Sequence, residues 1–239
     1  MAERDLFSAA PADDAPEADR AAGHRQAPLA ARMRPRSLEE YAGQRHILSE
    51  GMLLRRAIEA DRIQSLIFYG PPGTGKTTLA QIIANRTASR FVRLSGVESN
   101  VAEMRQVLAS AANRLENTGH PTLLFIDEIH RFNKAQQDVL LPDVEGGTVR
   151  LIGATTHNPF FFVNSPLVSR SQIFELQPLE AEDILRLLQR AVADEERGLG
   201  GMNLAVTDDA LQHLATISDG DARKALNSLE IAALTTPPG

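Results

Sequence analysis

The sequence predicts an α/β fold in which a parallel β-sheet is covered by helices and is followed by a small all-helical domain. Three observations support this prediction. Between residues 29 and 177, short apolar runs alternate with segments whose apolar residues recur every three or four positions, as in amphipathic helices. After Pro178 only helical periods remain. The chain has 239 residues, which is enough for one large or two smaller domains.

Residues 1–28 differ in composition from the rest of the chain. They are rich in alanine and acidic residues, and Leu6 and Phe7 are their only large apolar side chains beyond Met1. Such a segment buries too little surface to offset its loss of conformational entropy. We expect a disordered arm, in which Asp5-Leu6-Phe7 is either a short hook for a partner's groove or a chance apolar pair.

The α/β domain is predicted to occupy residues 29–177. Apolar runs that stop at turn residues are typical of strands buried on both faces, and they occur at Leu66–Tyr69, Phe91–Leu94, Leu123–Ile126, Val149–Ala154 and Ile173–Leu176. Between the second and third runs, apolar residues from Val101 to Leu115 step by three and four, and Asn100 with Glu103 fits a capping box. Alternating strands and helices imply right-handed crossovers and a parallel sheet.

Residues 178–239 are predicted to form the helical domain. Glu182 to Arg197 carries an apolar stripe and is expected to be one helix. Thr207 resembles a cap for a helix over Ala210–Ile217, and a third helix is expected over Asp221–Leu234.

The composition excludes several functional classes. Cysteine is absent, which excludes disulfides, thiolate nucleophiles and thiolate metal sites. No run approaches the ~20 apolar residues that cross a bilayer, and the first thirty residues lack the apolar core of a signal peptide. We therefore expect a cytoplasmic protein with no membrane partner. The net charge of −6 excludes a uniformly basic surface, although a local basic face could still bind nucleic acid.

A phosphate-binding loop follows the first predicted strand. Gly70-Pro71-Pro72-Gly73-Thr74-Gly75-Lys76-Thr77 matches G-x-x-x-x-G-K-[ST] without a mismatch. Gly73 and Gly75 allow backbone conformations in which several N–H groups converge on one anion. Lys76 is the expected cation for the β- and γ-phosphates, and Thr77, where a helix is expected to open, offers its hydroxyl to Mg²⁺. We assign these eight residues and Thr78 to nucleotide binding.

Two acidic residues, Asp127 and Glu128, end the third predicted strand. The carboxyl ends of parallel strands face the ligand crevice, so we expect both acids beside the phosphate loop. We assign Asp127 to Mg²⁺ and Glu128 to the water that attacks the γ-phosphate. The alternative is an acidic helix cap, which is common for an isolated Asp-Glu pair.

Four further residues are candidates for the reacting end of the nucleotide. Thr155 and Thr156 end the fourth predicted strand and could reach the γ-phosphate or the attacking water. Arg170 and Arg223 could supply positive charge to the phosphoryl oxygens. From periodicity alone, each arginine is more readily explained as a solvated surface residue.

The phosphate loop, the acidic pair, the threonines and the two arginines follow one another along the chain in an order that resembles that of the AAA+ ATPases. The runs Pro28 to Gln44, Ile129 to Asp138 and Ile152 to Thr156 resemble, more narrowly, the replication-associated recombination protein A group (RarA/MgsA), whose eukaryotic counterpart is the Werner-helicase-interacting ATPase. The resemblance extends from Pro28 to about Leu234. It implies an AAA+ P-loop NTPase sheet followed by a helical lid, with ATP and Mg²⁺ as cofactors.

The resemblance also implies roles for individual residues. Thr156 takes the sensor-1 position, Arg170 is the finger that reaches into a neighbouring subunit's ATP, and Arg223 is the sensor-2 arginine of the lid. With Lys76 and Glu128, these residues form the implied catalytic set. The region that lines the adenine pocket corresponds to Ala30, Arg34, Pro35, Tyr41, Gly43, Gln44 and Ile47.

Two features depart from the family pattern. His157 stands where family members usually carry glutamate, which puts any polar role of this position in doubt. The chain also stops just past the lid, whereas family members continue into a further helical domain associated with tetramer assembly. We therefore expect a fragment, with a homo-oligomer in the full-length protein and a monomer here.

The leading hypothesis is an ATP-hydrolysing motor in DNA replication, recombination and repair. The resemblance implies action at stalled forks and on single-stranded, gapped or forked DNA, with turnover stimulated by DNA and dependent on a neighbouring subunit. It also implies a nucleoid-associated location, with the sliding clamp or a single-strand-binding protein as partner. The alternative is a nucleotide-gated module that binds DNA or a partner, in which hydrolysis only resets the state. A small-molecule kinase is a third class, which the Asp127-Glu128 pair and the helical lid disfavour.

Overall fold

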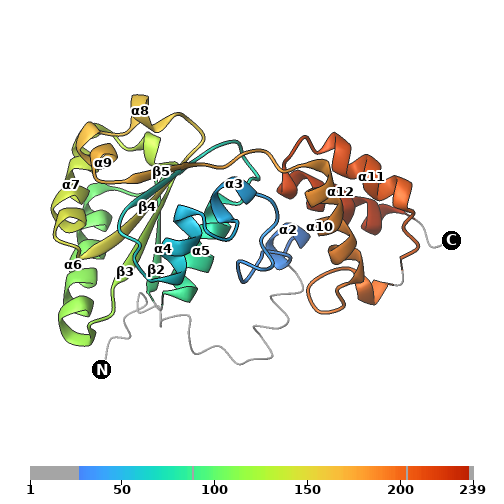
Figure 1. Cartoon of the computed structure of the whole chain (residues 1–239), viewed down its shortest axis with the longest axis horizontal. Helices are drawn as coiled ribbons and strands as arrows, with labels where there is room; N and C mark the ends of the chain where they lie inside the picture. The colour runs from blue at the N-terminus through green and yellow to red at the C-terminus, as the bar shows by residue number, and fades with distance from the viewer. Residues whose placement is uncertain (1–26, 88, 203, 237–239) are drawn as a thin grey trace, which may run out of the picture.

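The computed structural model describes residues 27–87, 89–202 and 204–236. Within them, a sheet region and a helical region lie side by side, and the chain passes from β5 to α10 between them (Figure 1). The Asp5-Leu6-Phe7 hook and almost all of the predicted arm lie outside the described residues. No helix in the described part of the chain is long and apolar enough to cross a membrane.

Five parallel strands form the sheet, in the order β2-β3-β4-β1-β5. Each predicted strand is confirmed to within one residue at either end: β1 (Leu66–Tyr69), β2 (Arg90–Ser95), β3 (Thr122–Asp127), β4 (Val149–Thr155) and β5 (Gln172–Glu175). Strand β4 therefore lies between β1, which leads into the phosphate loop, and β3, which carries the acidic pair. All three strands end at the same edge of the sheet.

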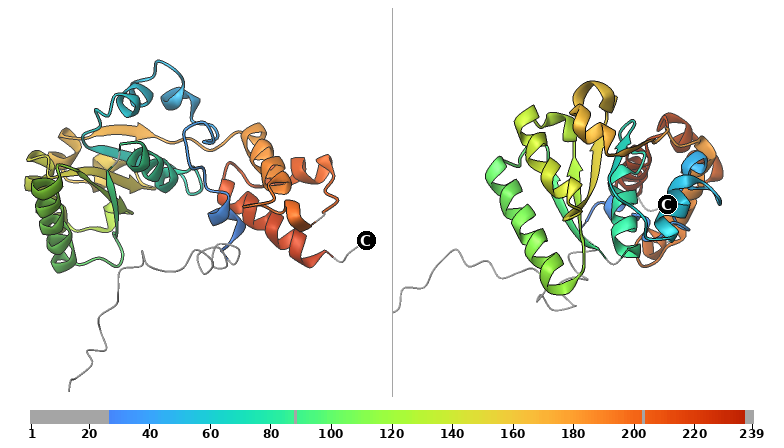
Figure 2. Two further views of the ribbon diagram at one scale, coloured as in Figure 1. Left: turned by 90° about the horizontal axis from the view of Figure 1, so that it is seen from below. Right: turned by 60° about the vertical axis from the view of Figure 1, so that its left-hand side comes forward.

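Helices cover both faces of the sheet. Helices α3 (Arg45–Leu48), α4 (Leu53–Glu59) and α5 (Lys76–Arg86) pack on one face, and α6 (Val101–Thr118), α7 (Lys134–Glu145) and α9 (Ser165–Ser169) pack on the other. Successive strand residues point to opposite faces, so the neighbours Ile67 and Phe68 belong to different cores. The right-hand view of Figure 2 shows the green helix α6 and the teal helix α5 on opposite sides of the strands.

The predicted capping box at Asn100 and Glu103 is only half correct. The Asn100 side chain accepts a hydrogen bond from the Glu103 backbone N–H, but Glu103 is exposed, so water competes for its carboxylate. A reciprocal box forms instead at the start of α7. There the Asn133 side chain accepts from Gln136 N–H, and the Gln136 side chain accepts from Asn133 N–H, each at 2.9 Å.

The helical region contains α10 (Ala181–Ala193), η2 (Gly200–Met202), α11 (Asp208–Ile217) and α12 (Ala222–Thr235). The helix predicted over 182–197 is too long. It ends at Ala193 because Asp194 is extended and its carboxylate accepts hydrogen bonds from the backbone N–H groups of Glu196 and Arg197. Thr207 and Asp221 cap α11 and α12 through their side chains.

The short helix α2 (Leu29–Arg32) packs against the helical region, although the sequence assigns it to the α/β domain. Leu29 and Met33 are fully buried in the core formed with α10, α11 and α12. Arg32 forms an ion pair of 3.0 Å with Glu230 on α12. The segment that leads from α2 to α3 therefore crosses from the helical region to the sheet region.

Candidate active site

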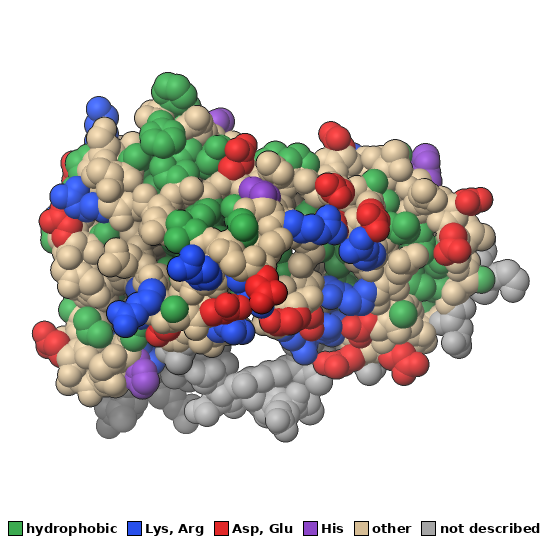
Figure 3. All heavy atoms as spheres, viewed as in Figure 1, with side chains coloured by type: hydrophobic (Ala, Val, Ile, Leu, Met, Phe, Trp, Pro, Cys, Tyr) green, Lys and Arg blue, Asp and Glu red, His purple; other side chains and the backbone are tan. Residues whose placement is uncertain are grey.

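A cavity of about 420 Å³ lies where the sheet region and the helical region meet. Its walls come from the loop after β1, the ends of β3 and β4, the segment around α2, and helices α10 and α12. Most of the predicted site residues line it: Ala30, Arg34, Pro35, Tyr41, Pro72, Gly73, Thr74, Gly75, Lys76, Thr77, Thr78, Asp127, Glu128, Thr156 and Arg223. Figure 3 shows basic and acidic side chains gathered around the hollow between the two regions.

The phosphate loop needs glycine at two of its positions. Gly73 and Gly75 have φ angles of +72° and +97°, which side chains rarely adopt. A Cβ at Gly73 would lie 1.8 Å from Asp221 Oδ1, and one at Gly75 would lie 2.3 Å from Tyr41 Oη. Gly75 is the N-cap of α5, which begins at Lys76, one residue earlier than predicted. The N-terminal end of α5, with its unpaired N–H groups, therefore lies at the cavity.

The Lys76 side chain is buried beneath the loop. Its Nζ donates to the carbonyl oxygens of Gly70 at 2.7 Å and Pro71 at 2.8 Å. Burial lowers the pKa of Lys76, and the nearby carboxylates of Glu128 and Asp127 oppose this shift. Gly70 and Pro71 do not line the cavity in the described structure. Their carbonyl oxygens instead hold the side chain of Lys76, which does line it.

The two acids at the end of β3 differ in conformation and partner. Asp127 forms a salt bridge of 2.5 Å with Arg93 on the neighbouring strand β2. Glu128 has a φ of 55°, a left-handed conformation that is uncommon outside glycine. Because the chain turns at this residue and enters η1 (Ile129–Arg131), the two carboxylates have different surroundings. Arg93 could not be predicted as part of the site from the sequence, since only the strand order shows that β2 is adjacent to β3.

Arginines from three parts of the chain lie near the acidic end of the cavity. Burial lowers the pKa of Arg34, and the positive charges of Arg223 and Arg93 lower it further, whereas Asp127 opposes this shift. Repulsion between partly buried cations is relieved when a polyanion binds between them. The electrostatics therefore favour a ligand with several negative charges.

The two threonines at the end of β4 lie in different places. Thr156 lines the cavity, whereas Thr155 is fully buried. The Thr155 hydroxyl contacts His130 Nδ1 at 2.9 Å and the backbone of His157. Of this pair, only Thr156 can face a bound ligand.

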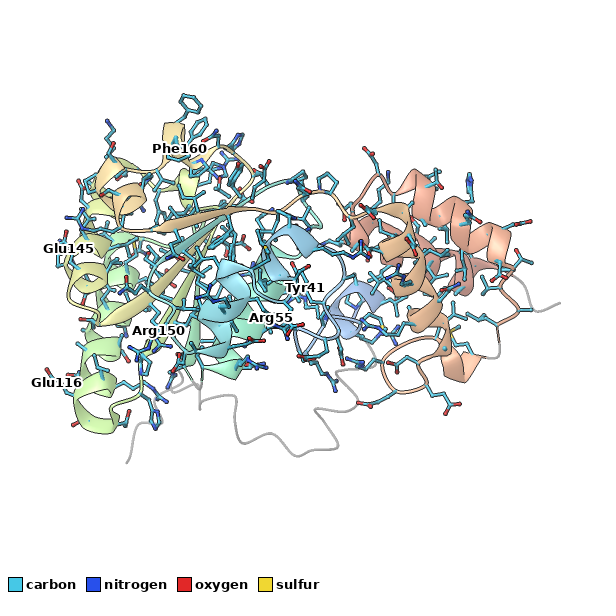
Figure 4. All side chains as sticks on the ribbon, in the orientation of Figure 1. Tyr41, Arg55, Glu116, Glu145, Arg150 and Phe160 are labelled. Carbon is cyan, nitrogen blue, oxygen red and sulfur yellow. The ribbon has the colours of Figure 1, made fainter. Side chains whose placement is uncertain are left out.

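Arg170 does not line the cavity of its own chain. It follows α9, where Nε lies 2.7 Å from Glu145 Oε1 and a terminal guanidinium nitrogen donates to the Pro166 carbonyl. Its side chain is 43% exposed. Figure 4 shows Glu145 at the outer edge of the sheet region, far from Tyr41 at the junction of the two regions.

Three residues of the implied adenine pocket lie outside the cavity in the described structure. Gln44 forms two hydrogen bonds with the backbone of Gln177, at 2.7 Å and 2.9 Å. Ile47 belongs to the core under the sheet, and Gly43 packs against Leu179. These residues tie the N-terminal segment to the link between β5 and α10.

Apolar residues that sequence patterns did not identify complete the cavity wall. They were missed because an apolar helical stripe has the same pattern whether it faces a core or a ligand. Those from the N-terminal segment and the helical region are Pro28, Ala31, Met33, Ala42, Leu179, Leu187, Ala222 and Leu226, and Asn227 lies beside them. The cavity therefore has an apolar end as well as a charged end, which suits a nucleotide base and its phosphates.

The side chains present fit magnesium bound with a triphosphate. Thr77 and Asp127 offer hydroxyl and carboxylate oxygens, the ligand type that Mg²⁺ prefers in proteins. Magnesium is commonly held by one or two protein ligands together with substrate phosphates, so two donors suffice. The phosphates themselves would meet Lys76 and the start of α5.

Comparisons with known proteins agree with this geometry. Residues 66–179 match the ATPase family associated with various cellular activities (AAA), and residues 200–239 match the AAA C-terminal domain. The chain is 49% identical over 206 residues to replication-associated recombination protein A of Escherichia coli K12, a match covering 86% of this chain and 46% of that protein. It is 44% identical over 206 residues to the ATPase WRNIP1 of Dictyostelium discoideum, covering 86% of this chain and 23% of that protein.

Solved structures show the same relationship. The Holliday junction branch migration motor RuvB of Thermotoga maritima superposes with a TM-score of 0.66 at 30% identity, covering 83% of this chain and 64% of that one. The chain spans about half the length of the bacterial relative it matches. The sheet order, the phosphate loop and these similarities lead to one conclusion: the chain belongs to the AAA+ ATPases and is similar to the replication-associated recombination protein A and WRNIP1 group.

Proposed function

We propose that this chain binds ATP with Mg²⁺ in the cavity between its two regions and hydrolyses it. The observation that carries the proposal is the convergence of three distant segments on one cavity. The phosphate loop, the acids that end β3 and the arginine that opens α12 all line it. Separately, each motif has an ordinary structural explanation, but their convergence is best explained by a nucleoside triphosphate.

Each residue has a part in the proposed hydrolysis. Lys76 and the start of α5 bind the phosphates, and Thr77 and Asp127 hold Mg²⁺, which when bound neutralises charge on the phosphate oxygens. Glu128 orients the attacking water. Thr156 and Arg223, which both line the cavity, would face the reacting phosphate and stabilise the charge that spreads over its oxygens.

The region after Pro178 would serve as a lid on the nucleotide. Leu187 and Leu226 belong to this region and line the same cavity as the phosphate loop. A nucleotide in the cavity would therefore bridge both regions and hold them in one arrangement. Arg170 would complete the active site of a neighbouring copy, since it is exposed and remote from its own cavity.

The whole protein would act in the cytoplasm, in DNA replication, recombination and repair. The names of the relatives support this process: one is called replication-associated recombination protein A, and RuvB is called a branch migration motor. We propose DNA-stimulated turnover at stalled forks, on single-stranded, gapped or forked DNA, with the sliding clamp or a single-strand-binding protein as partner.

A second candidate is a nucleotide-gated module that binds DNA or a partner. The shared cavity favours it, because ATP would order the two regions whether or not turnover drives movement. Turnover and binding measured with and without forked DNA, over a series of salt concentrations, distinguish the two. A motor accelerates hydrolysis on DNA, whereas a gated module binds DNA more tightly with ATP and shows unchanged turnover.

The test of the site itself uses two substitutions and calorimetry with Mg-ATP. We expect Lys76→Ala to weaken binding at least tenfold, about 1.4 kcal/mol. We expect Glu128→Gln to keep the affinity and to lose about 100-fold or more in turnover, as for the loss of an acid–base group. His120→Ala serves as a control, because His120 is exposed and does not line the cavity. Absence of binding heat with the folded wild-type chain would refute the proposal.

A further inference from the structure

A chain of close polar contacts joins Glu128 to the loop after β4. His130, in η1, is the central residue, and its side chain is only 7% exposed. Its Nδ1 lies 2.9 Å from Thr155 Oγ1 and 3.3 Å from Glu128 Oε2. Neither His130 nor Thr155 lines the cavity, so neither has a part in the binding described above.

The neighbours of His130 Nδ1 determine where its proton lies. Thr155 Oγ1 accepts a hydrogen bond from His157 N–H at 3.0 Å and donates to the His157 carbonyl at 3.2 Å. A hydroxyl has one proton, so Thr155 accepts from His130 when that proton is given to the His157 carbonyl, and donates to Nδ1 when it is not. The ionised carboxylate of Glu128 only accepts. If Nδ1 carried no proton, its lone pair would face a carboxylate oxygen at 3.3 Å, which is repulsive. The carboxylate of Glu128 therefore favours the tautomer that carries the proton on Nδ1.

Glu128 has few other constraints on its side chain. Its backbone is fixed in the left-handed conformation, but the side chain is 34% exposed at the cavity. The contact with His130 gives one of its oxygens a defined position and leaves the other free to face a ligand. Thr155 extends this constraint to the end of β4, next to Thr156.

The loop after β4 also holds the imidazole ring. The ring of His157 packs edge-on against His130 with centroids 4.4 Å apart, and Phe162 of α8 (Pro159–Phe162) lies 5.0 Å from His157. His157 contributes in two ways. Its backbone satisfies the Thr155 hydroxyl, and its ring restricts rotation of the His130 ring.

We propose that His130 is a positioning residue for the hydrolytic reaction. Its Nδ1–H holds the Glu128 carboxylate in the orientation in which the free oxygen can bind the attacking water, and Thr155 holds His130. The inference rests on the proposed function in one respect, the assignment of Glu128 to that water.

The kinetic test uses two amides that differ in reach. The side-chain nitrogen of asparagine takes the place of Nδ1, whereas that of glutamine takes the place of Nε2. We expect His130→Asn to keep most of the turnover, and His130→Gln and His130→Ala to lose about 10- to 100-fold in kcat, the range found for partners that orient a reacting group. KM for ATP and the affinity for Mg-ATP should be unchanged in all three.

Equal turnover of His130→Asn and His130→Gln would overturn the proposal. If His130 only filled space, the position of the amide nitrogen would not affect turnover. His120→Ala is the control, and thermal unfolding with and without nucleotide identifies any variant that fails to fold. A variant that loses nucleotide affinity together with turnover would also count against a positioning role.

A second measurement does not depend on turnover. In the wild-type chain labelled with ¹⁵N-histidine, we expect the His130 ring to carry its proton on Nδ1, and we expect Glu128→Ala to shift its ¹⁵N resonances while those of His120 stay unchanged. A proton on Nε2 would overturn the proposal. If the wild-type chain hydrolyses no ATP, the proposed function fails, and the NMR result still decides whether His130 holds Glu128.

Discussion

At the residue scale, close contacts around the cavity make some positions intolerant of any side chain. Tyr41 Oη donates to the Thr74 carbonyl at 3.0 Å, and burial raises the pKa of Tyr41 well above its usual value. The neutral phenol therefore remains a donor over the physiological pH range. Its ring occupies the space that a side chain at position 75 would need, so the loop and Tyr41 are fixed together.

Gly75→Ala is expected to destabilise the fold and to abolish nucleotide binding. Its Cβ would lie 2.3 Å from Tyr41 Oη at a φ of +97°, and overpacking with backbone strain costs about 2–4 kcal/mol. Gly119→Ala is the matched control, because Gly119 also has a positive φ but has open space around its Cβ position. We expect it to cost about 1 kcal/mol. Urea unfolding and calorimetry with Mg-ATP measure both effects, and equal losses would contradict the steric argument.

His130 makes the stability of the fold depend on pH. Burial lowers its pKa, and the charges of His157 and Arg131 lower it further, whereas Glu128 opposes this shift. The unfolded chain, with a histidine pKa near 6.5, then binds more protons than the folded chain just below that pH. We expect the free energy of unfolding contributed by His130 to be present above about pH 6.5 and to fall as the pH decreases through the window below it.

Urea unfolding at a series of pH values between 5 and 8 measures this effect. His130→Asn has no titrating ring, so its stability should fall less than that of the wild type over the same range. Parallel curves for the two proteins would show that His130 does not contribute. His120→Ala is the control for removal of an exposed histidine.

At the element scale, α2 and α12 are joined by a largely enclosed ion pair. The Arg32 and Glu230 side chains are 12% and 19% exposed, and Glu230 also accepts from Leu29 N–H at 2.8 Å. Arg32 donates in addition to the Gly198 carbonyl at 3.0 Å. These contacts hold in place the helix that brings Ala30 to the cavity.

Glu230→Ala is expected to destabilise the chain by about 2–3 kcal/mol, because it leaves Arg32 enclosed without its counter-ion and Leu29 N–H without its acceptor. It should also weaken Mg-ATP binding, since α2 lines the cavity. Glu182→Ala is the matched control: it removes an exposed i,i+4 pair with Arg186, which contributes little to stability because water screens both charges. Urea unfolding compares the two, and a similar loss for both would mean that α2 is not held by this pair.

At the scale of the whole molecule, the position of Arg170 bears on the proposal that a second copy completes the site. The Arg170 guanidinium is exposed beside α7, and the three phenylalanines of α8 lie on the same side of the sheet region. Phe160, Phe161 and Phe162 are 65%, 81% and 49% exposed, and Figure 4 shows Phe160 pointing away from the sheet. If neighbouring copies supply Arg170, turnover will depend on assembly.

Mixing two inactive variants tests this dependence. Arg170→Ala and Glu128→Gln should each bind Mg-ATP but turn over at least tenfold more slowly than the wild type. Their mixture should exceed the sum of the two activities, because an intact Glu128 in one copy can meet an intact Arg170 from another. Arg150→Ala is the control, since it removes a different arginine ion pair, with Asp61. A mixture no more active than its components would contradict the assignment of Arg170.

The local sequence determined the strands, the phosphate loop and the acidic pair, because these features depend on patterns only a few residues long. Apolar runs predicted all five strands, and glycines at fixed spacing predicted the loop. The reciprocal half of the capping box at Asn100 and Glu103 and the end of α10 were wrong, because exposed side chains and an aspartate turn compete locally with the expected pattern. The domain boundary at Pro178 and the roles of the site residues stay predictions.

Only the tertiary structure decided which distant side chains meet. Arg93 reaches Asp127 because β2 is adjacent to β3, and Arg32 reaches Glu230 across 198 positions of sequence. The structure likewise separates Arg170 from its own cavity and joins Gln44 to Gln177. Such contacts depend on strand order and on the path of the chain between the two regions, which short-range propensities and spacing do not encode.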